Sequence, residues 1–242
     1  IPSNIRLKQP LSLPKALSEQ EYAEEIAGIA AQNQVNASYI GMGWYDTITP
    51  AAIYRNVFEN PVWYTSYTPY QAEISQGRLE ALLNFQTMVS DLTGLPLSNS
   101  SLLDEATAAA EAATMMYGLR DRALVKEKVE TLFVDKHIFP QTLSVLRGRM
   151  QQVGIEVVIG DYKEFAFDTP VYGAILQYPN SNGSVKDYRG FVEKSKEAGW
   201  KFAVATDLMA LVMLAPPGEW GADIAFGSSQ RFGVPMFYGG PS

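Results

Sequence analysis

The chain has no cysteine and only one histidine, His137, among its 242 residues. Without cysteine, disulfides, thiolate catalysis and cysteine-ligated metals are excluded within this chain. A single histidine excludes a multi-histidine zinc site and leaves His137 as the only candidate for a serine–histidine–aspartate triad. We interpret His137 instead as a polar loop residue, and we expect no metal site.

Long apolar runs are also missing. The longest, LMALVMLA at residues 208–215, is too short to cross a bilayer. The first residues, IPSNIRLKQPLSLP, lack the apolar core of a signal peptide. Acidic residues outnumber basic ones, 26 to 19, for a net charge of −7. This balance disfavours binding to nucleic acid or anionic membranes, and we expect neither as a partner.

The N-terminal part, residues 1–34, reads as an extended arm followed by a helix. Prolines at positions 2, 10 and 14 favour the extended arm, and Ser18 with Glu21 forms a capping box that starts the helix. Residues 35–76, here called the aromatic segment, are rich in Tyr, Trp, Gly and Pro and contain one short helical piece, PAAIYRNVFEN. A loop of this composition needs a packing or binding reason.

The rest of the chain alternates helices and strands. Four helices are predicted: SQGRLEALLNFQTMVSDLT, DEATAAAEAATMMYGL, QTLSVLRGRMQQVG and DYRGFVEKSKEAG. Gly94 ends the first of them, and Asp104 or Ser101 caps the second. The strands are TLFVD, IEVVIG, VYGAILQYP, KFAVATD and DIAFG. This alternation predicts an α/β fold with a mostly parallel sheet flanked by helices. We treat residues 35–242 as one structural unit, truncated at its C-terminus, and expect the chain to be a piece of a longer protein.

Two glycine motifs fail as catalytic signatures. GMGWYD, residues 41–46, lacks the third glycine of a dinucleotide-binding fingerprint. GSSQR does not match the G-x-S-x-G pattern of a nucleophile elbow, because Arg231 stands where the pattern requires glycine. Asp207 is more informative, since it ends the strand KFAVAT at the edge where open α/β sheets bind ligands. It could hold a protonated ring nitrogen or a loop, or cap a helix formed by LMALVML.

The stretch WYTSYTPYQAEISQGR combines hydroxyl and amide groups with one acid, Glu73, and one base, Arg78. Such a cluster suits recognition of a small polar ligand, with Arg78 available to a carboxylate. The alternative is an Arg78–Glu73 ion pair that braces the loop, with the tyrosines serving as packing. Composition alone does not decide between ligand recognition and loop bracing.

Long stretches resemble the N-terminal half of the glycine decarboxylase P-protein family. They are YIGMGWYDTITP, ENPVWYTSYTPYQAEISQGRLEALLNFQTMVSDLTGLPLSNSSLLDEATAAAEA and ATDLMALVMLAPPGEWGADIAFGSSQRFGVPMFYGGP. The resemblance implies the large domain of type I pyridoxal-phosphate enzymes, with an extended N-terminal arm. It implies release of CO2 from glycine and transfer of the aminomethyl group to the lipoyl arm of H-protein. It further implies a location in the bacterial cytoplasm or the mitochondrial matrix.

The resemblance also implies that the Schiff-base lysine belongs to the C-terminal half, which this chain lacks. Gln230 stands about where that lysine would be, and an amide cannot form an imine. Asp104 and Glu105 would crowd a phosphate at the helix N-terminus with like charge. Asp207 matches the acid that partners the pyridine nitrogen, and we assign it a structural role. Phe139 stands where the family usually has a histidine, at a position resembling the one that stacks on the cofactor ring.

Function in this half is then expected where it meets the other half or a second subunit. The candidates near substrate or cofactor are Tyr67, Thr68 and Tyr70. Those expected to fix their loop are Gln71, Glu73, Ser75, Gln76 and Arg78. A non-catalytic assembly domain of the same complex is the alternative, and an independent pyridoxal-phosphate enzyme is disfavoured by Gln230. The sequence leaves open whether the natural protein is one chain or two subunits.

Overall fold

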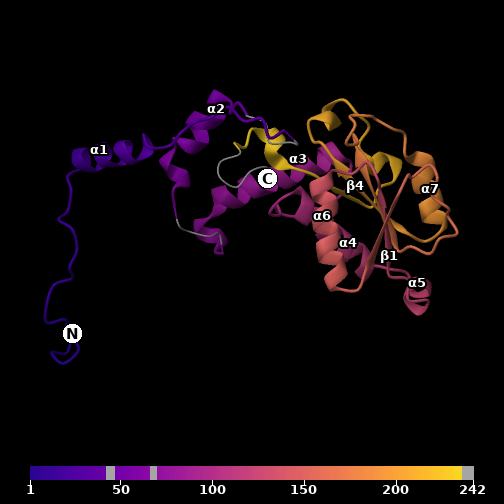
Figure 1. The fold of residues 1–242 in the computed structure, drawn as a ribbon, viewed down its shortest axis with the longest axis horizontal. Coiled ribbons are helices and arrows are strands. Elements are labelled where there is room, and N and C mark those ends of the chain that lie inside the picture. The colour runs from indigo at the N-terminus through magenta and orange to yellow at the C-terminus, as the bar shows by residue number, and fades with distance from the viewer. Residues whose placement is uncertain (42–46, 66–69, 236–242) are drawn as a thin grey trace. The chain divides into compact units, whose positions relative to one another are not determined.

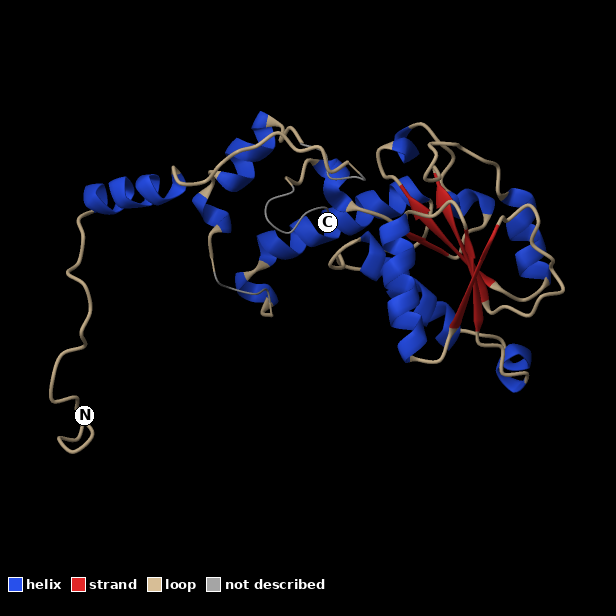
Figure 2. Ribbon diagram, viewed as in Figure 1, coloured by secondary structure: helices blue, strands red, loops and turns tan. Residues whose placement is uncertain are grey.

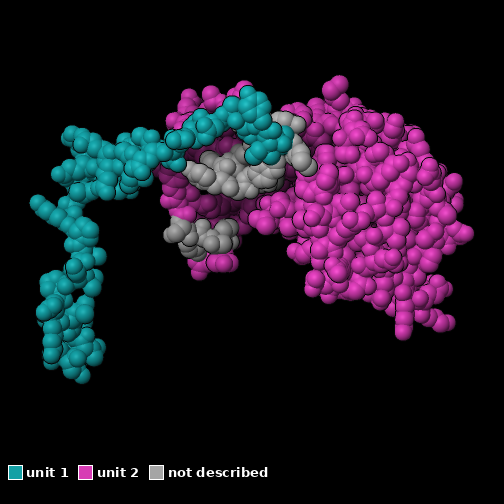
Figure 3. Space-filling model, in the orientation of Figure 1, with its two compact units in different colours: residues 1–45 teal, residues 46–242 magenta. Residues whose placement is uncertain are grey.

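A computed structural model describes residues 1–41, 47–65 and 70–235 of the chain. The chain divides into two compact units, residues 1–45 and residues 46–242 (Figure 3). Tyr67 and Thr68 lie outside the described residues.

The first unit is an arm that leads into helix α1, Glu19–Ala30. The predicted capping box is confirmed, because the Ser18 hydroxyl accepts from the Glu21 amide and Glu21 Oε2 accepts from the Ser18 amide at 2.7 Å. No residue of α1 is buried. Its apolar side chains Tyr22, Ile26 and Ile29 are exposed within this unit.

The second unit is built on five parallel strands in the order β2-β1-β3-β4-β5 (Figures 1 and 2). The strands are β1 Thr131–Asp135, β2 Glu156–Gly160, β3 Gly173–Tyr178, β4 Lys201–Thr206 and β5 Ile224–Phe226. In the register Thr131 lies opposite Glu156, and Gly173 lies opposite Lys201. The predicted α/β fold with a parallel sheet is therefore confirmed, since every strand pair is parallel and parallel neighbours require crossover connections.

Helices and short turns connect and cover the strands. The helices are α2 Ala51–Ile53, α3 Gln76–Thr93, α4 Glu105–Gly118, α5 Arg122–Lys126, α6 Pro140–Gln152 and α7 Arg189–Glu197. The single turns of helix are η1 Tyr54–Phe58, η2 Pro61–Trp63, η3 Ala72–Ile74, η4 Ala210–Val212, η5 Pro217–Trp220 and η6 Ser229–Phe232. Gly94 ends α3 in the left-handed conformation, φ 68°, and Asp104 rather than Ser101 caps α4. Sequence periodicity did not reveal α5 or most of the single turns.

Two apolar layers enclose the sheet. On one face α4 and α6 cover Leu132 and Val134 of β1, and on the other α7 lies over Phe133 (Figure 1). This alternation is the period of two that a strand imposes on its side chains. The α4 face is rich in alanine, which lets the helix approach the sheet closely. The opposite layer is filled by aromatic rings, including Phe202 and Trp220.

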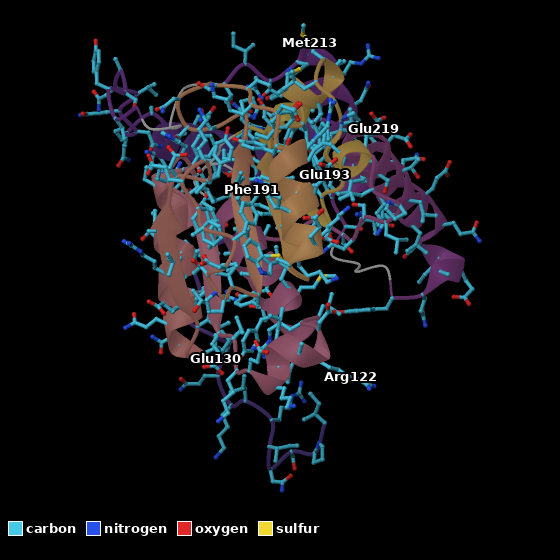
Figure 4. All side chains as sticks on the ribbon, turned by 90° about the vertical axis from the view of Figure 1, so that its right-hand side faces the viewer. Arg122, Glu130, Phe191, Glu193, Met213 and Glu219 are labelled. Atoms are coloured by element: carbon cyan, nitrogen blue, oxygen red, sulfur yellow. The ribbon has the colours of Figure 1, made fainter. Side chains whose placement is uncertain are left out.

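Because all strands run the same way, their carboxyl ends share one edge. Glu130 immediately precedes β1 and Met213 follows η4, and these two residues lie at opposite ends of the unit (Figure 4). The end that carries Met213 is therefore the carboxyl edge, where open α/β sheets bind ligands.

Candidate functional site

Asp207 immediately follows β4 at this edge, and its carboxylate accepts three hydrogen bonds. Its carboxylate accepts from Arg231 at 3.0 and 3.1 Å, and Oδ1 also accepts from the Met209 amide at 3.0 Å. The first two bonds form the two-pronged contact that arginine makes with carboxylates. Asp207 thus contacts a turn and a loop at once, and the structural role expected for it stays a prediction.

The loop held by Asp207 is η6, which contains Gln230. The Gln230 amide donates to Ser228 Oγ at 3.1 Å, and its side-chain nitrogen donates to the Val234 carbonyl. Phe232 packs edge-on against Phe85 of α3, with ring centroids 6.1 Å apart. Gln230 therefore takes part in closing a turn that rests on α3.

Glu105, the first residue of α4, is the most perturbed acid at this edge. Burial raises the pKa of its carboxyl to about 7, although a hydrogen bond with the Gln177 side chain opposes the shift. The negative charges of Asp207 and Asp104 raise this pKa further. Asp104 itself is the cap of α4, its Oδ1 accepting from the Thr107 amide at 2.7 Å.

His137 and Phe139 lie in the loop between β1 and α6. The His137 amide donates to Asp135 Oδ1 at 2.8 Å, and its ring nitrogen Nδ1 lies 3.1 Å from Asn182 Nδ2. Asp135 is buried and its second oxygen accepts from the Tyr162 amide at 3.0 Å. These contacts agree with a loop role for His137. Phe139 is part-buried and is the N-cap residue of α6, just before Pro140.

In the aromatic segment, Arg78 of α3 reaches back to an earlier turn. Its guanidinium donates to Thr65 Oγ1 at 2.6 Å and to the Trp63 carbonyl at 3.3 Å, and it lies 5.6 Å from the centre of the Trp63 ring. Among the described ion pairs none joins Arg78 to Glu73. Arg78 therefore contacts Trp63 and Thr65 in place of the Glu73 partner that the sequence offered.

The other candidates of this segment differ in exposure. Tyr70 is 88% exposed, and Gln71, Glu73 and Gln76 are exposed as well. Ser75 is buried, and its hydroxyl has no hydrogen-bond partner among the described residues. The structure gathers these residues around the start of α3, while Asp207, Gln230 and Glu105 gather at the carboxyl edge of the sheet.

Sequence reasoning missed two partners at that edge. In the sequence Arg231 only breaks a nucleophile pattern, whereas in the structure it reaches back past β5 to Asp207, just after β4. Gln177 was read only as part of a buried strand. A glutamine inside an apolar strand is itself a signal, because buried amides require polar partners.

Other classes of site find no support in the described part of the chain. No group of three acidic or histidine side chains is placed to hold a metal ion. No helix there is both long and apolar enough to traverse a bilayer.

The five-stranded parallel sheet with helices on both faces has the type I fold of pyridoxal-phosphate enzymes. A sphingosine-1-phosphate lyase of Burkholderia pseudomallei shares this fold with a TM-score of 0.55 and 13% identity, over 81% of this chain and 49% of the lyase chain. Residues 1–242 match the family model described as glycine cleavage system P-protein. The chain therefore belongs to the glycine cleavage system P-protein family.

Individual relatives agree with this assignment. A glycine dehydrogenase (decarboxylating) of Bacteroides thetaiotaomicron is 62% identical over 242 residues, and one of Nostoc punctiforme is 56% identical over 241. A glycine decarboxylase (P-protein) of the glycine cleavage system, solved in inhibitor-bound form, matches with a TM-score of 0.75 and 33% identity over the whole chain and 55% of its own. This chain spans 26% of the Bacteroides relative and 24% of the Nostoc one, about a quarter of their length.

Proposed function

We propose that this chain is part of the N-terminal half of a glycine decarboxylase. The complete protein would release CO2 from glycine and pass the aminomethyl group to the lipoyl arm of H-protein. The observation that carries the proposal is the family match along all 242 residues. Its partners would be the C-terminal half or a second subunit, H-protein and glycine, in the bacterial cytoplasm or the mitochondrial matrix.

The residues of this chain do not fit a covalently held pyridoxal phosphate at the carboxyl edge. No lysine follows β5 anywhere between residues 227 and 242, and the Gln230 amide cannot form an imine. The N-cap of α4 is Asp104, whose carboxylate opposes an anionic group there. We therefore infer that the rest of the protein holds the cofactor.

The contribution of this half is proposed to come from the aromatic segment. Tyr70 is almost fully exposed within its unit, and so its hydroxyl is available to a group outside this chain. Arg78 on α3 donates hydrogen bonds to Trp63 and Thr65, and these bonds attach the aromatic segment to the start of α3. In this proposal Tyr67, Thr68 and Tyr70 lie near substrate or cofactor, and Gln71, Glu73, Ser75, Gln76 and Arg78 support them.

An assembly role without contribution to chemistry is the second candidate. It is favoured by the large apolar side chains left uncovered around the same region, including Ile74, Leu83 and Val62. Uncovered apolar surface of this kind marks an interaction site. Both roles place a partner on the aromatic segment, and they differ in whether the tyrosine hydroxyls matter.

Tyr70→Phe and Tyr67→Phe in the complete protein separate the two roles. If a hydroxyl hydrogen bonds to substrate or cofactor, glycine turnover should fall about tenfold or more, which corresponds to one lost hydrogen bond to a polar or charged group. Assembly and melting temperature should not change. Tyr22→Phe on α1 is the matched control and should retain full turnover, because Tyr22 lies outside the segment. Full turnover in both test variants would leave the assembly role.

A further inference from the structure

Glu105 and Gln177 hold two buried hydrogen-bond acceptors that lack a donor. Oε1 of each side chain is shielded from solvent and has no partner among the described residues. Gln177 is 2% exposed at the end of β3, on the sheet face covered by α4. A buried acceptor left unpaired is destabilising, so two such atoms on neighbouring side chains require an explanation.

One proton on Glu105 supplies the missing donor. An ionised carboxylate only accepts hydrogen bonds, whereas the neutral acid has one O–H donor and still accepts. The Gln177 side chain lies close enough to the Glu105 carboxyl to influence its pKa. A neutral Glu105 can therefore accept from the Gln177 amide nitrogen and donate to the Gln177 amide oxygen.

The surrounding charges also disfavour the ionised form. Asp104 precedes Glu105 and already takes the amide of Thr107, and Asp207 lies at the end of β4. Arg231, the cation beside Asp207, is committed to that carboxylate by two hydrogen bonds. The α4 dipole favours an anion at its N-terminus, but too weakly to offset burial beside two acids.

We propose that Glu105 is a proton-dependent clasp between the first turn of α4 and the end of β3. With its proton, it is joined to the Gln177 amide by paired hydrogen bonds; without it, a buried anion faces an acceptor oxygen and the clasp opens. The clasp is a property of the α/β core, and it holds whether or not the aromatic segment contributes to a shared site.

The pH range over which the clasp opens follows from the difference in the pKa of Glu105 between the closed and the opened turn. Burial raises the pKa of Glu105 from its ordinary value of 4.5 to about 7, so between these values the closed turn binds a proton that the opened turn does not. The stability of this turn should therefore fall as the pH rises through the window. It should be constant below about pH 4.5 and above about pH 7, where both states carry the same charge.

Hydrogen exchange on the complete protein, with Glu105→Gln as the matched control, tests the clasp. The glutamine amide donates and accepts as the neutral acid does, and it does not titrate. The exchange rate of residues 104–112 in the wild type, divided by that of the variant, should rise by up to tenfold per pH unit between about pH 4.5 and pH 7. Residues 189–197 of α7 should show a ratio near one throughout.

A rate ratio for residues 104–112 that stays constant across this window would overturn the clasp. If Glu105→Gln fails to fold, the wild-type protein provides its own comparison, since α7 shares the intrinsic pH dependence of amide exchange. Protection of residues 104–112 should then fall relative to α7 over the same window. Parallel protection of the two helices at every pH would refute the proposal without the variant.

Discussion

The guanidinium of Arg231 donates to both carboxylate oxygens of Asp207, which immediately follows β4. This contact fixes η6 at the carboxyl edge, where Phe232 packs on Phe85 and Gly233 fits against Pro50 and Ile53. The ion pair therefore connects the sheet to α3 and to the start of α2. The position of a loop held in this way depends on the bidentate contact of the guanidinium with the carboxylate.

Arg231→Lys should loosen η6, because a lysine cannot make the two-pronged contact with Asp207. Both side chains are partly exposed, so we expect a loss of about 1 kcal/mol or less, equivalent to about fivefold faster hydrogen exchange in residues 228–235. Arg189→Lys is the control. Its contact with Asp187 is a single exposed one at 3.7 Å, and its replacement should change nothing measurable. Equal exchange in η6 for the wild type and Arg231→Lys would contradict the bracing role.

Gly227→Ala should destabilise the α/β unit. A Cβ at this position would meet the carbonyl oxygen of Thr206, a backbone atom that cannot rotate away. We expect a cost of about 1–3 kcal/mol, as for overpacking elsewhere in protein cores. Gly148→Ala on α6 is the matched control of opposite sign, because its Cβ would meet nothing within 4 Å and alanine favours a helix by about 1 kcal/mol. Calorimetry of the complete protein should show a lower melting temperature for the first variant and a higher one for the second.

Pyridoxal phosphate should not form an imine with any lysine of this chain. The complete protein can be mixed with the cofactor, reduced with borohydride, digested and analysed by mass spectrometry, with an unreduced sample as control. We expect the reduced adduct only on a peptide from outside residues 1–242, because Gln230 offers no amine. An adduct on one particular lysine within this chain would mean that this half binds its own cofactor.

The strands and most long helices could be predicted from local patterns. TLFVD and KFAVAT are short apolar runs, and the boundaries of α3 and α4 are marked by Gly94 and Asp104, residues whose effect on a helix end is local. The order of the strands could not be predicted in this way. It depends on which runs pair after crossovers, and no single run carries that information.

The candidate site was less accessible to sequence reasoning, because its properties come from distant contacts. Glu105 was expected as a charge that repels phosphate, but its raised pKa depends on burial beside Gln177. Arg78 was linked to Glu73 by proximity in sequence, whereas its partners Trp63 and Thr65 are brought to it by folding. Tyr67 and Thr68 lie outside the described residues, and their role stays a prediction.

The alanine face of α4 sets the distance between this helix and the sheet, and with it the position of the helix start at the carboxyl edge. Ala109, Ala110 and Ala113 are completely buried against the sheet, so the helix axis cannot move closer, and any larger side chain would push it away. Because a helix is stiff over this length, the spacing set by the alanines is passed on to its first turn, where Glu105 reaches Gln177. The three methyl groups thus set how close Glu105 comes to Gln177 at the start of the same helix, and substitutions among them should alter that contact without touching either side chain.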